Sequence, residues 1–214
     1  MAAEISVEHK LKDALGKLRA ESKERKFDQT IDLIVNLQKF DIRKNSINSV
    51  VSIPNKIKDK KICAFLDVKN SSVDTITKEE FKKYSDKKTL KNLVKKYDFF
   101  IAQASVMPAV ATTFGRFLGP AGKMPSPQLG IIMNAEPKII EEVKGKVNNS
   151  IKVRTKDTSF KTAIGKMSMK DEAIIENIIA IYNAMIKELP RDKENIKNLE
   201  IKFTMSKPIK IQVR

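Results

Sequence analysis

The hydrophobic and polar positions of the chain change their period several times, and each change marks an expected element. Residues 6–20 carry apolar side chains three and four positions apart, which predicts an amphipathic helix. Residues 27–37 alternate instead, with Phe27, Ile31 and Leu33 on one side, which predicts a half-buried strand. A second strand is expected over 47–53, where it stops before Pro54.

The middle of the chain has shorter and more continuous apolar runs. Residues 62–68 are typical of a strand covered on both faces. Thr77 and Glu80 have the spacing of a capping box, which predicts a short helix. Further elements are a helix face formed by Leu90, Leu93, Val94 and Tyr97, a strand over 98–104, a helix over 107–114 with Pro108 in its first turn, and a helix opened by Asn134–Pro137 that ends near Gly145. This alternation predicts an α/β unit with a mainly parallel sheet.

After Gly145 the alternating pattern returns. Strands are expected over 151–155 and 161–167. Ser168 is expected to cap the next helix, whose first turn holds acidic residues and which Pro190 ends. Two last alternating strands are expected at 199–205 and 209–213. Because the two ends resemble each other and the middle differs, the simplest organisation is a discontinuous domain of residues 1–58 and 150–214 with an α/β domain inserted at 59–149.

Charge points to a polyanion as the partner. The 214 residues include 42 Lys and Arg against 26 Asp and Glu, a formal net charge of +16. The sequence pI of about 9.8 is typical of nucleic-acid binding. The expected split domain has a net charge of +10 and the insert one of +6, so the split domain is the better candidate for phosphate contacts.

Other classes of protein are disfavoured by composition. The single cysteine, Cys63, lies in an apolar run and allows neither a disulfide scaffold nor a cysteine-rich zinc site. The single histidine, His9, has no neighbours that suggest a catalytic arrangement, so no catalytic residue, metal or cofactor is predicted. No apolar run approaches the roughly 18 residues of a membrane span, and no signal peptide is recognised, which favours a cytoplasmic location.

The most unusual stretch, residues 114–127, holds three glycines and three prolines. Gly122 and Lys123 look like the end of a phosphate-binding loop, but Met124 stands where Mg²⁺ needs a hydroxyl and Phe117 where the motif needs glycine. Nucleotide hydrolysis is therefore disfavoured. The alternatives are a rigid structural loop and a loop that presents Arg116 and Lys123 to an RNA backbone.

This stretch also carries a resemblance. Residues 115–125, Gly-Arg-Phe-Leu-Gly-Pro-Ala-Gly-Lys-Met-Pro, resemble the signature of the L-one family of ribosomal proteins, called L-ten-a in eukaryotes. Further matching segments follow in the family's order over essentially the whole chain: residues 25–30, 152–156, 165–169 and 204–206. Residues 100–104 are similar to the archaeal type of the family.

The resemblance implies a fold and a function. The fold would be α/β with two domains, a split sandwich-like α/β domain and an inserted Rossmann-like domain of three layers. The protein would be a structural, non-enzymatic part of a 50S-type large ribosomal subunit, binding large-subunit rRNA at the mobile stalk near the tRNA exit site. It would take part in the release of deacylated tRNA, and it would repress translation by binding its own mRNA.

The resemblance also implies which residues contact rRNA. Lys26, Phe27 and Thr30 match contact positions at the first strand, where they could meet a phosphate, a ribose or base, and a 2′-hydroxyl. Thr204, Met205 and Ser206 match a Thr-Met-Gly turn, in which Ser206 stands in place of the family's glycine. The remaining rRNA-binding predictions are Arg154, Lys166 and Asn198. For Phe27 and Met205 the competing interpretation is core packing, by alternation with Ile31 and Phe203.

Three other functions remain open at this point. A stand-alone translational repressor would bind messenger at least as tightly as rRNA. A nucleotide-using enzyme would show saturable ATP or GTP binding despite the broken motif. A generic basic scaffold would not discriminate among RNAs.

Overall fold

The computed structural model describes residues 2–23, 25–43, 45, 47–84, 86–155 and 157–212, with residues 2–6 described as helical backbone only. The chain forms two compact units, one built from residues 1–57 and 149–214 and the other from residues 58–148. Both mix helices with sheet, so the fold is α/β, with an antiparallel main sheet in the first unit and a parallel one in the second. Among the described helices, none has the length and apolar character needed to cross a membrane.

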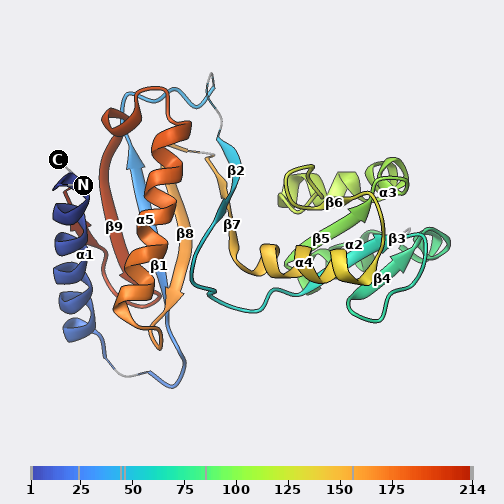
Figure 1. Ribbon diagram of the computed structural model, residues 1–214, viewed down its shortest axis with the longest axis horizontal. Helices are drawn as coiled ribbons and strands as arrows, with labels where there is room; N and C mark the ends of the chain where they lie inside the picture. Colours follow the sequence, from blue (N-terminus) through green and yellow to red (C-terminus); the bar gives the residue numbers. More distant parts are fainter. Residues whose placement is uncertain are drawn as a thin grey trace. The chain divides into compact units, whose positions relative to one another are not determined.

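The split unit is built on a four-stranded antiparallel sheet in the order β10-β9-β1-β8 (Figure 1). Its strands are β1 (Thr30–Leu37), β8 (Ser159–Lys166), β9 (Ile196–Phe203) and β10 (Ile209–Ile211), and its helices are α1 (Ala2–Glu21), α5 (Asp171–Glu188) and the short 3-10 helix η2 (Asp192–Asn195). Leu11, Leu15 and Leu18 of α1 join one face of this sheet and the isoleucines of α5 in a single core. The alternation in β1 therefore reflects one covered face and one polar face.

A two-stranded antiparallel ladder carries the chain out of the split unit and back into it. Strand β2 (Asn48–Ser52) pairs with β7 (Ser150–Arg154), and Ser52 lies opposite Ser150. The hydrogen bond from the Ile53 N–H to the Asn149 carbonyl, 2.8 Å long, extends the ladder to the point of exchange. The two crossings are thus fixed to each other by backbone hydrogen bonds within one unit.

The second unit has a parallel sheet in the order β4-β3-β5-β6. Its elements are β3 (Ile62–Leu66), β4 (Asp74–Thr77), the 3-10 helix η1 (Lys78–Tyr84), α2 (Lys87–Lys96), β5 (Phe99–Gln103), α3 (Met107–Ala121), β6 (Ile131–Ile132) and α4 (Pro137–Asn148). Phe65 and Phe100 pack with α2 and α3 on one face, and Ala64 and Ile101 pack with Ile140 of α4 on the other. Three layers result, and burial on both faces explains the continuous apolar strands.

Several boundaries differ from the sequence expectations. Strand β3 ends at Leu66, and Val68 is exposed. Helix α4 continues through Gly145 to Asn148, because a glycine inside a helix costs stability without ending it. The very short strands β4 and β6 were not predicted, since runs of four and two residues carry almost no periodicity. The expectations for Lys156 and Val213 lie outside the described residues.

The interpretation of residues 114–127 as a loop is wrong for its first half. Helix α3 continues to Ala121 and contains Pro120. It ends where Gly122 adopts a left-handed φ of 70° and its N–H donates to the Gly119 carbonyl, while the Lys123 N–H donates to the Leu118 carbonyl. This pair of bonds is a Schellman C-cap, which requires glycine at the left-handed position. Gly122 thus ends this helix, and the other glycines and Pro120 lie within it.

Candidate nucleic-acid interface

Two threonines on neighbouring strands fix one end of the sheet in the split unit. Thr30 opens β1, and Thr204 follows the last residue of β9. The Thr30 N–H donates to the Thr204 hydroxyl at 3.1 Å, and the Thr204 N–H donates to the Thr30 carbonyl at 3.0 Å. The Thr204 hydroxyl also lies 3.3 Å from that carbonyl, to which it can donate. Both backbone segments therefore have fixed positions at this end of the sheet, where Thr204 is exposed and Thr30 is partly exposed.

Gln29 ties the next residues to the same end. Its side chain is 3% exposed, and its Oε1 atom accepts the Met205 N–H at 3.3 Å. Its carbonyl accepts the Met167 N–H at 2.8 Å, so one residue joins the ends of β1, β8 and β9. Gln29 is not among the residues predicted from the sequence. A polar residue on the alternating apolar face was the signal that could have revealed it.

Large apolar side chains are exposed beside this framework. Phe27 is 52% exposed, although most phenylalanines of the described chain are buried, and Met205 is 62% exposed. Residues 26–27 form a bend before β1, and residues 204–206 form a turn after β9, so neither side chain continues the alternation of its strand. Core packing is therefore the wrong interpretation for both. We call the area formed by Lys26, Phe27, Thr30, Lys166, Thr204, Met205 and Ser206 the Thr30–Thr204 surface.

Ser206 closes the turn of this surface. Its hydroxyl accepts the Phe203 N–H at 2.9 Å, and its own N–H donates to the Phe203 carbonyl at 3.2 Å. Its φ is not positive, since Lys39 and Asp192 are the only non-glycine residues of the described chain with that geometry. The backbone at this position therefore does not require glycine, and the serine hydroxyl gives the turn a hydrogen bond that glycine cannot supply.

Asp28 links the surface to the turn after β8. Its carboxylate accepts the Ser168 hydroxyl at 2.8 Å and the Ser168 N–H at 3.2 Å, and the Lys166 ammonium lies 3.7 Å away. The hydroxyl of Ser168 is the main reason why the pKa of Asp28 lies below its ordinary value; burial raises it, while the Ser168 N–H and Lys166 lower it further.

The predicted cap at Ser168 is therefore wrong. Helix α5 begins after Lys170, whose side chain makes no capping hydrogen bond, and the acidic residues Asp171 and Glu172 occupy its first turn as expected. Ser168 lies too early in the turn to cap the helix, and its hydroxyl binds Asp28 instead.

Arg19 of α1 holds the other side of this turn. Its guanidinium donates to the carbonyls of Met167 and Met169, each at 2.9 Å, and to the Asp171 carboxylate at 2.8 Å. A planar group with five donors suits this arrangement. Arg19 is not among the residues predicted from the sequence, because no spacing in the sequence indicates a partner about 150 residues away.

Two predicted residues lie away from the Thr30–Thr204 surface. Asn198 lies six residues before Thr204 on β9, which is about 20 Å along an extended strand. Its side chain is 5% exposed and donates to Glu200 at 3.2 Å, while its Oδ1 atom is buried without a partner. Arg154 is exposed and is the last residue of β7. The chain then enters β8 at Ser159, which pairs with Asn36 at the end of the sheet opposite to Thr30. The structure therefore does not bring these two residues together with the threonine pair.

The two secondary candidates lie in the other unit. Arg116 is exposed on α3. Lys123 is partly buried, and its ammonium donates to the carbonyls of Val94 and Tyr97, each at 2.7 Å. These carbonyls belong to the end of α2, where a helix accepts cations. Lys123 therefore has a structural role that its position in the sequence did not reveal.

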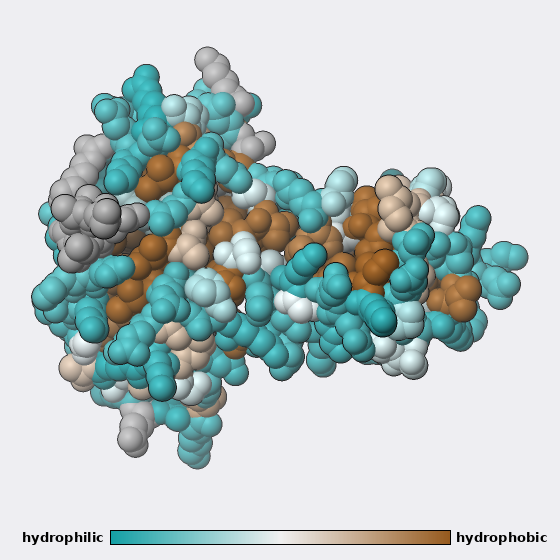
Figure 2. Space-filling view, viewed as in Figure 1, coloured by the Kyte–Doolittle hydropathy of each residue, from teal (hydrophilic) through white to brown (hydrophobic). Residues whose placement is uncertain are grey.

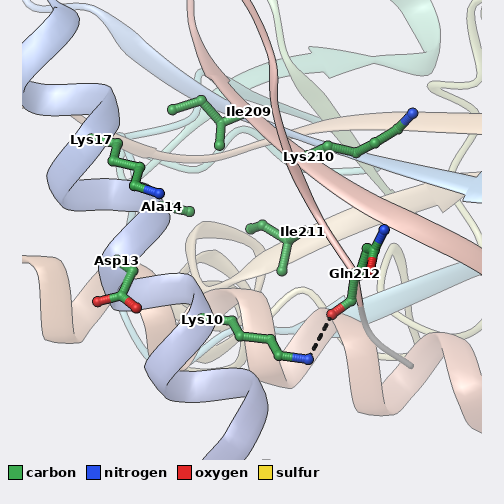
Figure 3. A pocket seen from close by; sticks show the side chains of 8 residues that line it. All are labelled: Lys10, Asp13, Ala14, Lys17, Ile209, Lys210, Ile211 and Gln212. Atoms are coloured by element: carbon green, nitrogen blue, oxygen red, sulfur yellow. Dashed lines mark hydrogen bonds between the residues drawn. The ribbon is translucent and has the colours of Figure 1, made fainter.

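A shallow groove between α1 and β10 has a different character. Lys10, Asp13 and Lys17 of α1 face Ile209 and Ile211, while the side chain of Lys210 points away from α1 (Figure 3). The Lys10 ammonium donates to the Gln212 carbonyl at 3.1 Å. None of the residues selected from the sequence lines this groove.

Surface composition fits a polar partner. Much of the visible surface of both units is hydrophilic, with scattered apolar patches (Figure 2). In the described part of the chain, no group of three or more His, Cys, Asp or Glu side chains could hold a metal ion. Hydroxyl groups, exposed apolar side chains and cations are the means of recognition that the Thr30–Thr204 surface offers.

Comparison with known proteins gives one consistent result. The model of the "Ribosomal protein L1p/L10e family" matches residues 18–207. The chain is 36% identical over 201 residues to "Large ribosomal subunit protein uL1" of Nanoarchaeum equitans, covering 89% of this chain and 94% of the relative. It is 35% identical over 214 residues to the protein of the same name in Thermococcus kodakarensis, covering 95% and 97%. For Methanothermobacter thermautotrophicus the identity is 33% over 217 residues, covering 96% and 100%.

Proposed function

Since the chain belongs to the ribosomal protein L1p/L10e family and is by that membership a structural, non-enzymatic protein of the large ribosomal subunit, we propose that it binds large-subunit rRNA through the Thr30–Thr204 surface. The part of the rRNA that we expect it to bind is the mobile stalk, as the family resemblance of residues 115–125 and 204–206 implies. Membership in this family also argues against the nucleotide-using enzyme considered from the sequence.

The observation that carries the proposal is the exposure of Phe27 and Met205 beside a rigid framework. Keeping large apolar side chains exposed to water costs free energy, and a partner that covers them removes this cost. The framework holds them without burying them, because the threonine pair and Gln29 fix the backbone at this end. Such a preorganised surface loses little entropy on binding.

The chemistry of the surface suits a folded RNA. Phe27 can stack on an unpaired base or lie against a ribose, and Met205 adds a soft apolar contact. The Thr204 hydroxyl can exchange hydrogen bonds with a 2′-hydroxyl, a group that DNA lacks. Lys26 is exposed and Lys166 partly exposed, so both can approach phosphates. Shape, 2′-hydroxyls and phosphates together would give recognition of a folded RNA.

The test uses the full chain and compares an rRNA stalk fragment with a scrambled duplex of equal length across a salt series. We expect the stalk fragment to bind far more tightly, and its advantage to persist as salt rises, because the counterion-release contribution is common to both RNAs. Equal affinities that fall equally steeply would contradict the proposal and favour the generic basic scaffold.

A matched pair of variants locates the contact. The double variant Phe27→Ala, Met205→Ala should lose most of the preference for the stalk fragment. The control double variant Val68→Ala, Met133→Ala removes two other exposed apolar side chains, which lie in the inserted unit, and should keep that preference. If both double variants bind like the unmodified chain, the Thr30–Thr204 surface is not the contact.

Three further properties stay predictions: repression of the chain's own mRNA and participation in the release of deacylated tRNA, which the resemblance implies, and the cytoplasmic location expected from the sequence. A repressor would use the same surface for messenger and rRNA. Competition between the stalk fragment and the leader of the chain's own mRNA tests this, since a shared surface requires that each RNA displaces the other.

A further inference from the structure

Helix α2 of the inserted unit carries four lysines on one exposed strip, Lys87, Lys88, Lys91 and Lys95. At 100° per residue they fall within an arc of about 100°, and Lys87, Lys91 and Lys95 follow one ridge over about 12 Å. Leu90 and Leu93 lie outside this arc and are buried against the aromatic core. We call these four side chains the lysine stripe.

Most of the stripe opposes the stability of its own helix, since only Lys95 lies in the last turn, where the helix dipole favours cations. Lys87 and Lys88 lie in the first turn, where the dipole favours anions, and the acidic residue next to them, Asp86 at the N-cap, makes no capping hydrogen bond. Lys87 and Lys91, and again Lys91 and Lys95, are like charges four positions apart, which repel each other. In the described part of the chain, no ion pair of 4.0 Å or less involves a lysine of the stripe. Helix formation alone therefore does not account for this arrangement.

Other lysines of the same unit are placed differently. Lys58 pairs with Asp98 at 3.1 Å, and Lys69 pairs with Glu80 at 3.0 Å. Lys96, next to the stripe, lies 4.8 Å above the ring of Tyr97. On α4 the lysines have Glu141 or Glu142 three or four positions away, which is the usual spacing of solvated helix charge. Uncompensated repulsion is thus a property of the stripe and not of every lysine in the unit.

We propose that the lysine stripe binds the phosphate backbone of an RNA helix, as a second contact independent of the Thr30–Thr204 surface. The identification of the polyanion as RNA rests on the proposed function. Lysine ammonium groups act as point charges and the stripe contains neither arginine nor an aromatic residue, so it engages phosphates without reading bases. A membrane is disfavoured because the apolar face of α2 is occupied by the core of its own unit.

The test compares two triple variants of the full chain with equal charge change. One is Lys87→Gln, Lys91→Gln, Lys95→Gln, and the control is Lys138→Gln, Lys144→Gln, Lys146→Gln on α4. The probes are the rRNA stalk fragment and a short RNA duplex of arbitrary sequence. The slope of log affinity against log salt should become shallower by roughly 2 to 3 for the stripe variant on the stalk fragment. At low salt its affinity for both probes should fall at least about tenfold, and the control should change much less.

Equal slopes for the two triple variants would overturn the proposal. The lysines of the stripe would then affect RNA binding only through the net charge of the protein, as the lysines of α4 do. An unchanged slope in the stripe variant would also overturn it and would direct attention to an acidic protein as the partner. The thermal midpoint checks folding: it should not fall, since the substitutions remove like-charge repulsion. If it falls, the triple variant Lys87→Arg, Lys91→Arg, Lys95→Arg serves as the second test. It keeps the three charges, so its slope of log affinity against log salt must equal that of the unmodified chain.

The two proposals fail separately. The double variant Phe27→Ala, Met205→Ala should lose the preference for the stalk fragment and keep the salt slope. If the unmodified chain shows no such preference while the stripe variant still loses slope, the proposed function fails and the stripe remains an RNA contact. If the preference is present and the slopes of the triple variants agree, only the stripe fails.

Discussion

The Thr204 hydroxyl accepts the Thr30 N–H at 3.1 Å, while the Thr30 carbonyl accepts the Thr204 N–H at 3.0 Å. This reciprocal arrangement lies just beyond the regular ladder between β1 and β9, whose last pair here is Ile31 with Phe203. The side chain of Thr204 thus supplies the acceptor for the N–H of Thr30, the first residue of β1. This side-chain contact and the bond from the Met205 N–H to Gln29 together position the exposed turn that contains Met205.

The hydroxyl of Thr204 can be removed without changing the shape of the side chain. In Thr204→Val the Thr30 N–H loses its acceptor, and we expect the free energy of unfolding to fall by about 1 kcal/mol. Affinity for the rRNA stalk fragment should fall about tenfold, which corresponds to about 1.4 kcal/mol. Thr204→Ser keeps the hydroxyl and serves as control. Equal binding by the two variants would show that the hydroxyl does not act in recognition.

Phe27 and Phe203 should respond in opposite ways to truncation. Phe27 is half-exposed, so Phe27→Ala should leave the free energy of unfolding within about 0.5 kcal/mol while binding weakens. Phe203 is fully buried, so Phe203→Ala should cost about 3 to 5 kcal/mol. Urea unfolding of both variants checks the contrast. A large loss of stability in Phe27→Ala would assign this ring to the core after all.

These two phenylalanines also show how far periodicity predicts the structure. The period of two correctly predicts β1 and β9, whose buried faces hold Ile31, Leu33 and Phe203. Extrapolating it outward to Phe27 and Met205 fails, because the chain bends before β1 and turns after β9. Periodicity reports burial only where the backbone is regular, and functional side chains lie where that regularity stops.

The site was predictable only in part for a related reason. The resemblance selected Phe27, Thr30, Thr204 and Met205, and the structure brings them to one sheet end. Gln29 and Arg19 escaped notice because their partners lie more than 140 residues away in sequence. The end of α3 shows the converse error: Gly122 was recognised as a special position, but its helix cap was mistaken for part of a loop.

The carboxyl groups of Asp28 and Asp32 should titrate on opposite sides of their ordinary pKa of 3.8. The pKa of Asp28 is lowered, chiefly by the hydroxyl of Ser168, so its stabilising contribution is present above 3.8 and is lost as pH falls through the lowered value. Burial raises the pKa of Asp32 more than Lys202 lowers it. NMR titration of the two carboxyl carbons measures both midpoints. Ser168→Ala should move the Asp28 midpoint upward; no movement would contradict the assigned cause.

Cys63 offers a probe of the inserted unit. Burial raises the pKa of its thiol to about 12, and the nearby Asp74 carboxylate adds to the effect. At pH 8 almost no thiolate exists and the side chain is inaccessible, so a thiol reagent should not label the native chain. Labelling should begin only as denaturant opens the unit, and because Cys63 is the single cysteine, the rate reports this opening alone. Rapid labelling without denaturant would contradict the burial of β3.

Substitution of Lys123 tests whether a cation in the glycine- and proline-rich stretch stabilises the fold or binds the partner. Its ammonium holds the carbonyls of Val94 and Tyr97 at the end of α2, each at 2.7 Å. Lys123→Met keeps much of the aliphatic stem and removes both charged hydrogen bonds, so the unit should lose about 1 to 3 kcal/mol of stability. Binding of the arbitrary RNA duplex should stay unchanged at temperatures where the variant is folded. Arg116→Met, which removes an exposed charge on α3, is the matched control and should leave stability unaltered. A loss of RNA affinity without a loss of stability in Lys123→Met would restore the RNA contact expected from the sequence.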